Sequence, residues 1–419
     1  MSRKKLLAAR TAHCLLLIMK IVRIIARLNV GGPARHVVWL TKNLQGAEFQ
    51  SVLLTGTVPE GEEDMNYFAA ENGVSPVYIP EMSRELSPKD VVSLWKVFRR
   101  MWREKPDVIH THTAKAGTIG RVAGFFYRWL AWKDVKMIHT YHGHVFHSYY
   151  GKRKTAIFLF IEKSLARLTD KIIAISEQQR AEINEKFGVG RARQFQVVQL
   201  GIDLSPFAGA EAKRHILREE IGAADDEILV GFVGRLTEIK NIPLLLEAAK
   251  IYKEQARADL PKLRFVIIGD GHLRGDLEAE AEKLGVRDVV LFLGNRSDTG
   301  VFYAGLDIVA LTSLNEGTPL SLIEAMANGT AFVSTAVGGV VDLLGRQVAE
   351  HENFRICERG IGVASGDAQA LCGGLIYLAK DENLRKALGA RGREFVRDNY
   401  SKERLTTDII NLYRELKQN

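Results

Sequence analysis

Short apolar runs rich in valine, isoleucine and leucine alternate with longer amphipathic segments from Lys20 almost to the end of the chain. Apolar runs of about four to seven residues separated by helical patterns are typical of parallel strands covered on both faces. The alternation runs through the first half of the chain and restarts in the second half. It predicts an α/β protein made of two Rossmann-like, doubly wound domains.

The same pattern predicts where the individual elements lie. In the first half it predicts strands at Ile21–Ala26, Ser51–Leu54, Pro76–Ile79, Val108–His110, Lys136–Thr140, Lys171–Ile175 and Gln196–Leu200. In the second half it predicts strands at Ile228–Val233, Arg264–Ile268, Val289–Leu293, Ile308–Leu311 and Ala331–Ser334, each followed by a loop and a helix. Helices are predicted at Ala34–Leu44, Pro88–Glu104, Ala156–Leu168 and Leu273–Leu284, with a last helix near Lys402–Leu416.

A chain of 419 residues is long enough for two domains with separate cores. The segment Gly201–Ala210 is rich in turn formers and lacks periodicity, so we place the hinge there. The predicted division is 1–18 as a basic extension, 19–204 and 205–400 as the two domains, and 401–419 as a helix that crosses back. Two such domains facing each other imply a cleft between the carboxyl ends of their strands, where these folds bind ligands.

Cysteine and hydropathy patterns exclude several protein classes. Cys14, Cys357 and Cys372 are far apart and lack CxxC spacing, which excludes a disulfide scaffold and a zinc ribbon. No run reaches the roughly 18–20 apolar residues of a spanning helix. The apolar run Cys14–Met19 is too short for a signal peptide, so we expect a cytoplasmic protein.

The charge is distributed unevenly along the chain. Residues 1–204 carry 31 lysines and arginines against 18 acidic residues, whereas residues 205–419 carry 27 against 32. A basic half joined to a mildly acidic half suggests that only the first half faces an anion. That anion could be nucleic acid, a phospholipid surface or a phosphorylated substrate, and a generally basic solvated surface is the alternative.

The segment 315–327 follows a predicted strand and contains two glutamates. Thr318 is a good N-cap and Pro319 suits the first helical turn, so we expect a helix that begins here and ends near Gly329. The N–H groups at such a helix start suit a diphosphate. The carboxylates of Glu316 and Glu324 suit hydroxyl groups, and a sugar nucleotide offers both kinds of partner. The alternative is a capped helix with two solvated glutamates.

A second segment, 231–241, ends the first strand of the second half. It places Arg235 and Lys240 in one short loop at the carboxyl end of a strand. Two cations on the same sheet edge as the helix start could clamp a diphosphate. In isolation this loop would be an ordinary surface loop, but together with the glutamates it predicts a donor site for a sugar nucleotide.

These residues carry a family resemblance. Glu316 and Glu324, with seven residues between them, and the Gly-Arg-Leu-x-x-x-Lys loop at 234–240 resemble the retaining glycosyltransferases of family 4, which have the GT-B fold. The resemblance extends from Lys20 to about Tyr400 and includes the segments Gly31-Gly32, His110–Gly117, Thr140–Gly143 and Ala336–Gly339. The hinge departs from the family pattern, because Gln199-Leu200-Gly201-Ile202-Asp203 stands where many relatives have Asn-Gly-Val/Ile-Asp.

The resemblance implies a role for each matching residue. Arg235 and Lys240 would neutralise the leaving nucleotide diphosphate, while Glu324 would bind the ribose hydroxyls. Glu316 would bind the donor sugar, and His142 would stabilise the transition state beside it. The resemblance also places Gly31, Gly32, Arg296, Gly317, Thr318 and Leu320 at the donor, and His112 and Lys115 at the acceptor.

The sequence does not predict a metal ion or a dinucleotide cofactor. No Asp-x-Asp occurs, and a metal-bridged diphosphate needs paired carboxylates, so we expect no metal. A zinc site among His139, His142, His144 and His147 is the alternative, without support from a nearby cysteine or acid. The glycines of 269–275 have GxGxxxG spacing, and no acid follows near position +20, which disfavours a dehydrogenase.

Aromatic and cationic residues occur together in the basic half. The stretch Gly120–Lys133 contains five aromatic residues and three cations, and Lys152-Arg153-Lys154 follows nearby. This combination suits peripheral contact with an anionic membrane, on the inner face of the cytoplasmic membrane. The alternative is a set of aromatic core residues beside solvated cations.

The function implied is transfer of a hexose or N-acetylhexosamine from a nucleotide sugar, UDP-linked, with retention at the anomeric carbon and without a metal. The acceptor would be a glycan or lipid-diphosphate-linked glycan in bacterial surface polysaccharide biosynthesis, and no nucleic acid partner is expected. One alternative is a sugar-nucleotide 2-epimerase of the same fold. Another is a non-catalytic protein that binds nucleotide sugars.

Overall fold

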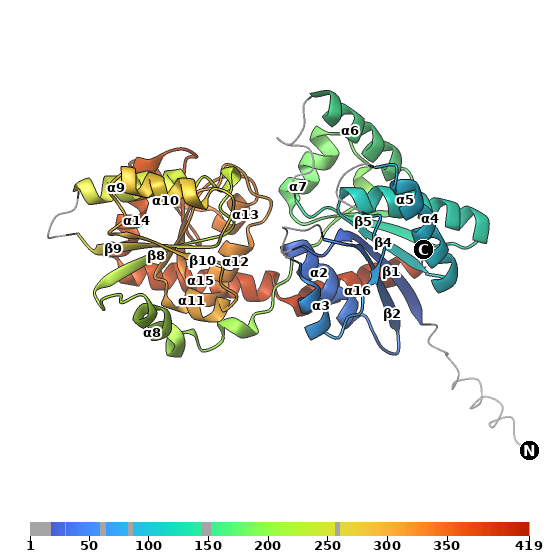
Figure 1. The fold of residues 1–419 in the computed structure, drawn as a ribbon, viewed down its shortest axis with the longest axis horizontal. Helices are drawn as coiled ribbons and strands as arrows, with labels where there is room; N and C mark the ends of the chain where they lie inside the picture. Colours follow the sequence, from blue (N-terminus) through green and yellow to red (C-terminus); the bar gives the residue numbers. More distant parts are fainter. Residues whose placement is uncertain are drawn as a thin grey trace, which may run out of the picture. The chain divides into compact units, whose positions relative to one another are not determined.

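The computed structural model describes residues 18–29, 31–58, 64–82, 87–143, 152–255 and 260–418, with only the backbone of 152–154. The chain forms two compact units (Figure 1). The first contains the residues up to Ile175, Arg180–Val198 and Thr406–Asn419, and the second contains Ser176–Gln179 and Gln199–Leu405. Residues 1–17 of the predicted basic extension lie outside the described residues.

The first unit is built on a parallel sheet of seven strands in the order β3-β2-β1-β4-β5-β6-β7. The strand order reverses between β1 and β4, as in a doubly wound fold. The strands are β1 (Met19–Arg27), β2 (Phe49–Gly56), β3 (Val77–Tyr78), β4 (Val108–His112), β5 (Lys136–Thr140), β6 (Lys171–Ala174) and β7 (Phe195–Val197). The helical segments are α2 (Gly32–Asn43), α3 (Asn66–Glu71), α4 (Asp90–Glu104), α5 (Ala114–Ala131), α6 (Lys152–Ala166), η1 (Glu182–Lys186) and η2 (Ala192–Gln194). Helix α7 (Glu177–Ala181) is divided, because its residues up to Gln179 are assigned to the second unit.

Helices cover both faces of this sheet because its central strands are apolar on both sides. Ile24 of β1 packs with Val97 of α4 on one face, whereas its neighbour Ile25 packs with Val37 of α2 on the other. Adjacent residues of a strand point to opposite faces, so a continuous apolar run supplies two cores. The carboxyl end of β4 is fully buried and brings His112 to the sheet edge.

The second unit is built on a sheet of eight strands in the order β10-β9-β8-β11-β12-β15-β14-β13. The strands are β8 (Glu227–Val233), β9 (Lys262–Ile268), β10 (Val290–Gly294), β11 (Ile308–Leu311), β12 (Ala331–Thr335), β13 (Gln347–His351), β14 (Phe354–Cys357) and β15 (Ile361–Val363). Its helical segments are η3 (Ser205–Phe207), α8 (Ala210–Glu220), η4 (Glu238–Lys240), α9 (Ile242–Gln255), α10 (Arg274–Lys283), α11 (Thr299–Gly305), α12 (Leu320–Asn328), α13 (Val340–Leu344), α14 (Ala368–Lys380) and α15 (Glu382–Asn399).

The last three strands of this sheet were not predicted. Strand β14 pairs antiparallel with both β13 and β15, so the sheet is mixed rather than purely parallel. Four of the five residues of β13 are exposed, and the strand therefore has no apolar run that periodicity could detect. Each of the five strands that were predicted is followed by a helical segment, as expected, but the prediction missed the three strands at this edge.

The chain passes into the second unit between Val198 and Gln199, before the predicted boundary at 204/205. Arg404 donates to the carbonyl oxygens of Gln199 and Leu200, just before the predicted hinge, each at 2.7 Å. Within the hinge, Ile202 N donates to Tyr400 O at 2.7 Å. The hinge segment is therefore partly structured rather than a free linker.

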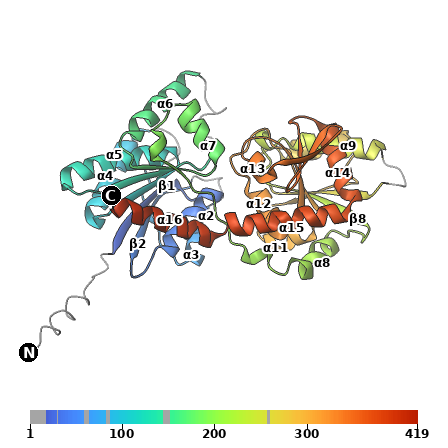
Figure 2. The same ribbon diagram turned by 180° about the vertical axis from the view of Figure 1, so that it is seen from behind.

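The last helix, α16 (Lys402–Gln418), belongs to the first unit from Thr406 onward. Figure 2 shows α15 and α16 as two successive red helices. The hydroxyl of Tyr413 lies 2.7 Å from His110 Nδ1, and its ring lies 6.5 Å from that of Phe49. The end of the chain thus completes the core beneath the first sheet.

Within the described ranges, no helix is both long enough and apolar enough to cross a membrane.

Candidate functional site

Two loops of the second unit carry the predicted donor residues, and the strand order makes them neighbours. Strand β8 leads into the loop with Arg235 and Lys240, and β11 leads into the loop with Glu316. The two strands pair in parallel, so both loops leave the same sheet edge. A backbone hydrogen bond of 2.8 Å from Leu314 N to Ile239 O joins the loops directly.

Lys240 and Glu316 form an ion pair in which Nζ lies 2.5 Å from Oε1. The hydroxyl of Ser313 donates to the same carboxylate oxygen at 2.6 Å, and Thr312 donates to the carbonyl of Lys240 at 2.8 Å. The side chains of Lys240 and Glu316 are only 18% and 12% exposed. The sequence predicted both charges at the site, but the structure adds that they neutralise each other.

Arg235 differs from Lys240 in its surroundings. It is exposed, and its side chain makes no hydrogen bond or ion pair with the described residues. The clamp predicted from the sequence therefore consists of one available guanidinium and one ammonium that is held by a carboxylate. An anionic ligand can approach Arg235 without breaking a contact, whereas Lys240 must exchange Glu316 for the ligand.

The helix after the Glu316 loop begins later than predicted. Helix α12 starts at Leu320, and Pro319, with φ −71° and ψ 114°, is its N-cap. The hydroxyl of Thr318 is buried and has no hydrogen-bond partner among the described residues, so the predicted Thr318 cap is wrong. Thr318 stands one position too early, because a cap side chain must reach the second or third N–H of the helix. The predicted end at Gly329 is correct, since Gly329 is the C-cap with φ 82°.

The late glycine turn at Gly338-Gly339 packs directly on this loop. Gly339 N donates to Glu316 O at 3.0 Å, and a Cβ on Gly339 would lie 1.6 Å from Gly317 O. A side chain there would displace the backbone that carries Glu316. The glycine turn therefore shapes the donor loop.

Glu324 lies in α12 and is buried, with only 9% of its surface exposed. The hydroxyl of Tyr303, from α11, lies 3.2 Å from Glu324 Oε2 and 3.0 Å from Ser321 O. Tyr303 therefore orients the carboxylate that the family resemblance assigns to the ribose. No feature of the sequence distinguished Tyr303 from an ordinary core aromatic.

Arg296 follows β10 at the edge of the sheet and is held by acidic neighbours. Its guanidinium contacts Asp298 at 2.6 Å and Glu220 at 2.5 Å. These hydrogen bonds, to Asp298 and then Glu220, raise the pKa of Arg296. Among the described residues, no contact joins Arg296 to the other predicted donor residues.

In the first unit, three histidines from three elements meet. His112 ends β4, His142 follows β5, and His36 lies on α2. His112 Nδ1 lies 2.9 Å from His142 Nε2, and the ring of His36 lies 4.8 Å from that of His142. The sequence singled out His112 and His142 separately, as acceptor and sugar residues, but did not predict their contact and did not single out His36.

Burial keeps the imidazoles of His112 and His142 neutral. It lowers the pKa of His142 to about 3 and holds the pKa of His112 well below its usual range. Neutral imidazoles offer one N–H donor and one lone pair each. They can therefore hydrogen-bond to a sugar or acceptor but cannot provide positive charge at neutral pH.

The remaining predicted residues of the first unit have distinct environments. Lys115 is buried and forms an ion pair with Asp90 of α4. Gly31 is the N-cap of α2 with φ 153°, and Gly32 is the first residue of that helix. A Cβ on Gly31 would meet only Pro33 Cδ, at 3.7 Å, so the glycine loop is open on that side. The predicted cleft between the two domains stays a prediction.

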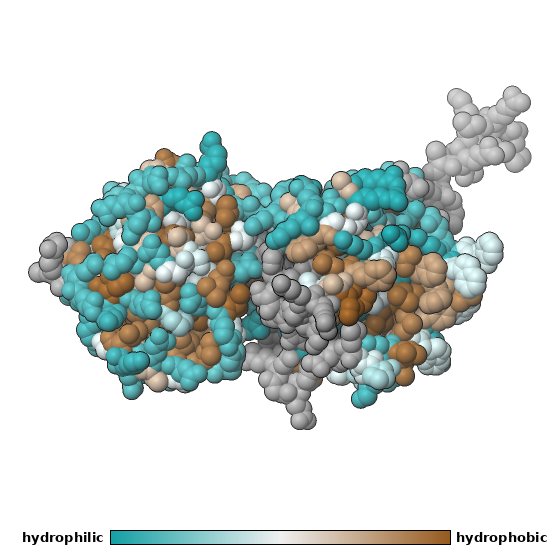
Figure 3. All heavy atoms as spheres, turned by 90° about the horizontal axis from the view of Figure 1, so that it is seen from above, coloured by the Kyte–Doolittle hydropathy of each residue, from teal (hydrophilic) through white to brown (hydrophobic). Residues whose placement is uncertain are grey.

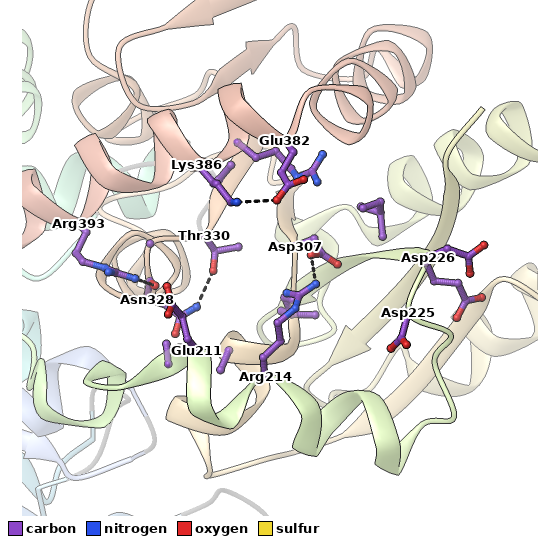
Figure 4. A pocket seen from close by; sticks show the side chains of 18 residues that line it. Glu211, Arg214, Asp225, Asp226, Asp307, Asn328, Thr330, Glu382, Lys386 and Arg393 are labelled. Carbon is purple, nitrogen blue, oxygen red and sulfur yellow. Dashed lines mark hydrogen bonds and ion pairs between the residues drawn. The ribbon is translucent and has the colours of Figure 1, made fainter. Parts of the chain in front are cut away.

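A separate pocket of about 480 Å³ lies in the second unit (Figure 4). Glu227 and Ala331, at the starts of β8 and β12, line it, so it lies at the sheet edge opposite the donor loops. Two ion pairs lie within it, Arg214 with Asp307 and Lys386 with Glu382, so part of its charge is already neutralised. We therefore do not assign the donor to this pocket.

Helices α4, α5 and α6 carry exposed apolar side chains that we call the aromatic face. Helix α5 packs on both α4 and α6. Figure 3 shows hydrophobic side chains gathered over the first unit, to the right of the grey atoms. Of the five aromatic residues in Gly120–Lys133, only Tyr127 is buried, which contradicts the core explanation for the other four. The aromatic face consists of Val91, Val92, Trp95, Trp102, Phe125, Phe126, Trp129, Leu130, Trp132, Ile157 and Phe160.

Comparison with known families covers most of the chain. The family described as "Glycosyltransferase Family 4" matches residues 30–206, and "Glycosyl transferases group 1" matches residues 213–395. Each family model thus matches one of the two sheets.

Curated relatives and solved structures agree with this match. The chain is 29% identical to the Escherichia coli UDP-Gal:alpha-D-GlcNAc-diphosphoundecaprenol alpha-1,3-galactosyltransferase, over 71% of this chain and 77% of the relative. It is 25% identical to the capsular polysaccharide biosynthesis glycosyltransferase CapM of Staphylococcus aureus, over 84% and 87%. The crystal structure of Anabaena HepE in complex with UDP matches with a TM-score of 0.74 at 21% identity, over 95% of this chain and all of that one.

Proposed function

The chain belongs to glycosyltransferase family 4 with the GT-B fold, and we propose that it is a retaining, metal-independent hexosyltransferase. The donor is a UDP-linked hexose or N-acetylhexosamine. The acceptor is a glycan or a lipid-diphosphate-linked glycan of bacterial surface polysaccharide biosynthesis. The single observation that carries this proposal is the pairing of Lys240 with Glu316 beside the start of α12.

The donor chemistry follows from charges at one sheet edge. A nucleotide diphosphate brings negative charge, for which Arg235, Lys240 and the N–H groups at the start of α12 are suitable partners. The sugar brings hydroxyls, for which Glu316 is a suitable acceptor. Binding of the donor would therefore separate Lys240 from Glu316 and give each group its own part of the ligand.

Relatives support the choice of nucleotide and acceptor. The Escherichia coli relative is named for a UDP-galactose donor and a diphosphoundecaprenol-linked acceptor, and CapM is named for capsular polysaccharide biosynthesis. Anabaena HepE was crystallised in complex with UDP-glucose. We extend these three properties to this chain as part of the proposal.

The proposed reaction is a front-face substitution. The acceptor oxygen attacks the anomeric carbon on the face from which the diphosphate leaves, so the new bond retains the donor's configuration. The bond between the anomeric carbon and the phosphate oxygen breaks, and that oxygen takes the acceptor's proton. Arg235 and Lys240 stabilise the negative charge on the leaving diphosphate, which grows in the transition state. The neutral imidazole of His142 hydrogen-bonds near the reacting sugar.

The test is a screen of nucleotide sugars for thermal stabilisation and for slow hydrolysis, followed by transfer to a lipid-diphosphate glycan. UDP-sugars should raise the melting temperature and support transfer in excess EDTA. Loss of transfer in EDTA with recovery on added magnesium or manganese would contradict metal independence. Inversion of configuration at C2 of the sugar in the absence of an acceptor would instead indicate a 2-epimerase. Thermal stabilisation by a nucleotide sugar without any turnover would indicate a non-catalytic binding protein.

We also propose that the aromatic face contacts an anionic membrane, where a lipid-linked acceptor resides. Cations flank the exposed rings, and the guanidinium of Arg99 lies 5.4 Å from the Trp95 ring centre. Aromatic rings and nearby cations suit the interface between lipid headgroups and acyl chains. Each cation near such a surface contributes about 1 kcal/mol, and salt screens this attraction.

The membrane proposal is tested by sedimentation with vesicles. The protein should sediment with anionic vesicles more than with neutral ones, and less at about 500 mM than at 50 mM salt. Replacing Trp129 and Trp132 with alanine should reduce sedimentation without lowering the melting temperature. Tyr67→Ala removes an exposed aromatic of α3, on the other face of the sheet, and serves as the matched control. Equal sedimentation with both vesicle types, or none, would contradict membrane contact.

A further inference from the structure

The three histidines of the first unit converge on one point. His36, His112 and His142 each offer a ring nitrogen, and these nitrogens all lie within 4.8 Å of one another. The family resemblance gives His142 and His112 roles at the sugar and the acceptor. It gives no role to His36, so the three-histidine arrangement exceeds what the proposed reaction requires.

The spacing suits a single metal ion. A tetrahedral zinc ion with nitrogen ligands at 2.0–2.1 Å holds them about 3.4 Å apart. The 2.9 Å between His112 Nδ1 and His142 Nε2 would open by about half an ångström. Since no two of these nitrogens lie more than 4.8 Å apart, no separation would have to close by more than about 1.4 Å, which small rotations of the imidazole rings can supply.

The proton count also permits a metal. His112 Nε2 and His142 Nδ1 are buried and make no hydrogen bond with the described residues. The two rings share one hydrogen in their mutual bond. Binding a metal between them moves that hydrogen to the far nitrogen of its own ring and leaves two lone pairs facing the ion.

The donor set selects the class of metal. It consists of three imidazoles and includes no carboxylate. Imidazole nitrogen suits zinc, copper, nickel and iron, whereas magnesium, manganese and calcium prefer oxygen ligands. Three histidines with an open fourth position are also a known arrangement for zinc with a bound water.

We propose that His36, His112 and His142 bind one zinc ion or a similar first-row transition-metal ion. Because the ion binds the imidazole nitrogen with which His142 would hydrogen-bond near the sugar, it inhibits sugar transfer and is not a cofactor. The binding site stands on its own geometry, while the inhibition rests on the proposed function. Of the four histidines at which the sequence left a zinc site as the alternative, His142 belongs to this cluster and His139 does not, while His144 and His147 lie outside the described residues.

The direct test is a titration of chelator-treated protein with Co²⁺, followed by the visible absorption of four-coordinate cobalt. The wild-type protein should bind one equivalent, and Zn²⁺ should displace it. His36→Gln should weaken binding by about 100-fold or more, because even the loss of a group that only supports a ligand costs 10- to 100-fold. His215→Gln, an exposed histidine on α8, is the matched control and should bind cobalt like the wild type.

Several outcomes would overturn the site. Absence of cobalt binding, or equal binding by wild type and His36→Gln, would remove it. Circular dichroism of His36→Gln, with His36→Asn as a second variant, separates loss of a ligand from loss of folding. Zn²⁺ should inhibit transfer by the wild type and inhibit His36→Gln only at about 100-fold higher concentration, matching its weaker affinity. If no transfer occurs with any donor, the cobalt titration still decides the metal site, and transfer without cobalt binding leaves the proposed function intact.

Discussion

The Lys240–Glu316 ion pair allows a quantitative test of how the donor binds. In the ligand-free chain the two groups neutralise each other, whereas the proposed donor complex gives Lys240 to the diphosphate and Glu316 to the sugar. The pair must then be present in the free enzyme and absent in the transition state. Lys240→Met, Glu316→Gln and the double variant measure this difference.

In protein unfolding, each single substitution removes the pair and leaves one charged group behind. Because the side chains are 18% and 12% exposed, each single variant should lose about 3 kcal/mol in the free energy of unfolding. The double variant leaves neither charge. Its loss should be smaller than the sum of the two single losses by about 1–3 kcal/mol.

In catalysis the deviation from additivity between the two substitutions, which we call their coupling, should have the opposite sign. The ratio kcat/KM compares the transition state with the free enzyme. Each single substitution removes a transition-state contact but also removes the pair that donor binding must break. In the double variant the second substitution removes another transition-state contact, but the ion pair is already gone and its loss cannot favour donor binding again. The double variant should therefore lose about 5- to 150-fold more kcat/KM than the product of the two single losses.

Urea unfolding and initial transfer rates at low donor concentration supply both quantities for the same four proteins. The proposed exchange predicts coupling of opposite sign in the two measurements. Coupling of the same sign would mean that the pair persists in the transition state, and it would refute the exchange.

Two further predictions concern single side chains and a third concerns three buried histidines. Arg235→Ala should lower kcat/KM by about 100- to 1,000-fold at an unchanged melting temperature, because Arg235 is exposed; activity within a few-fold of wild type would remove it from the clamp. Tyr303→Phe should raise the donor KM about 5- to 10-fold with little change in kcat, because it removes one hydrogen bond to Glu324; a fall in kcat alone would contradict this role. Burial lowers the pKa of His110, His112 and His139. As the pH falls below about 6.5, the unfolded chain therefore binds protons that the folded chain does not bind. Each of these histidines should lower the free energy of unfolding by about 1.4 kcal/mol for each pH unit below that value. A free energy of unfolding, measured with urea, that stays constant between pH 7.5 and 5 would contradict this prediction.

The parallel strands were predictable because their physical cause lies in the local sequence. Strands β5 and β11 have the predicted bounds, since an apolar run between polar segments leaves few other places for the strand to begin and end. Strands β13–β15 were not predictable in the same way. They are short and depend on pairing in series, because β15 pairs with β12, β14 with β15 and β13 with β14, and the residues of β13 carry no apolar run.

The site was predictable as a set of residues but not as a set of contacts. Arg235, Lys240, Glu316 and Glu324 could be named because their spacing matches a family pattern. The Lys240–Glu316 pair depends on the neighbouring positions of β8 and β11, which join residues far apart in the sequence. His36 and Tyr303 escaped detection for the same reason, because each resembles an ordinary helix residue until the fold places it beside its partner.

Transfer itself is the most direct test of the proposed chemistry. The purified chain would be incubated in excess EDTA with an α-linked UDP-hexose and a lipid-diphosphate glycan, and the product's anomeric configuration would be read by NMR. The proposed mechanism predicts UDP release and a new α-linkage. A β-linkage would contradict retention, and a UDP-sugar that neither binds nor reacts, while another nucleotide sugar does, would contradict the proposed donor.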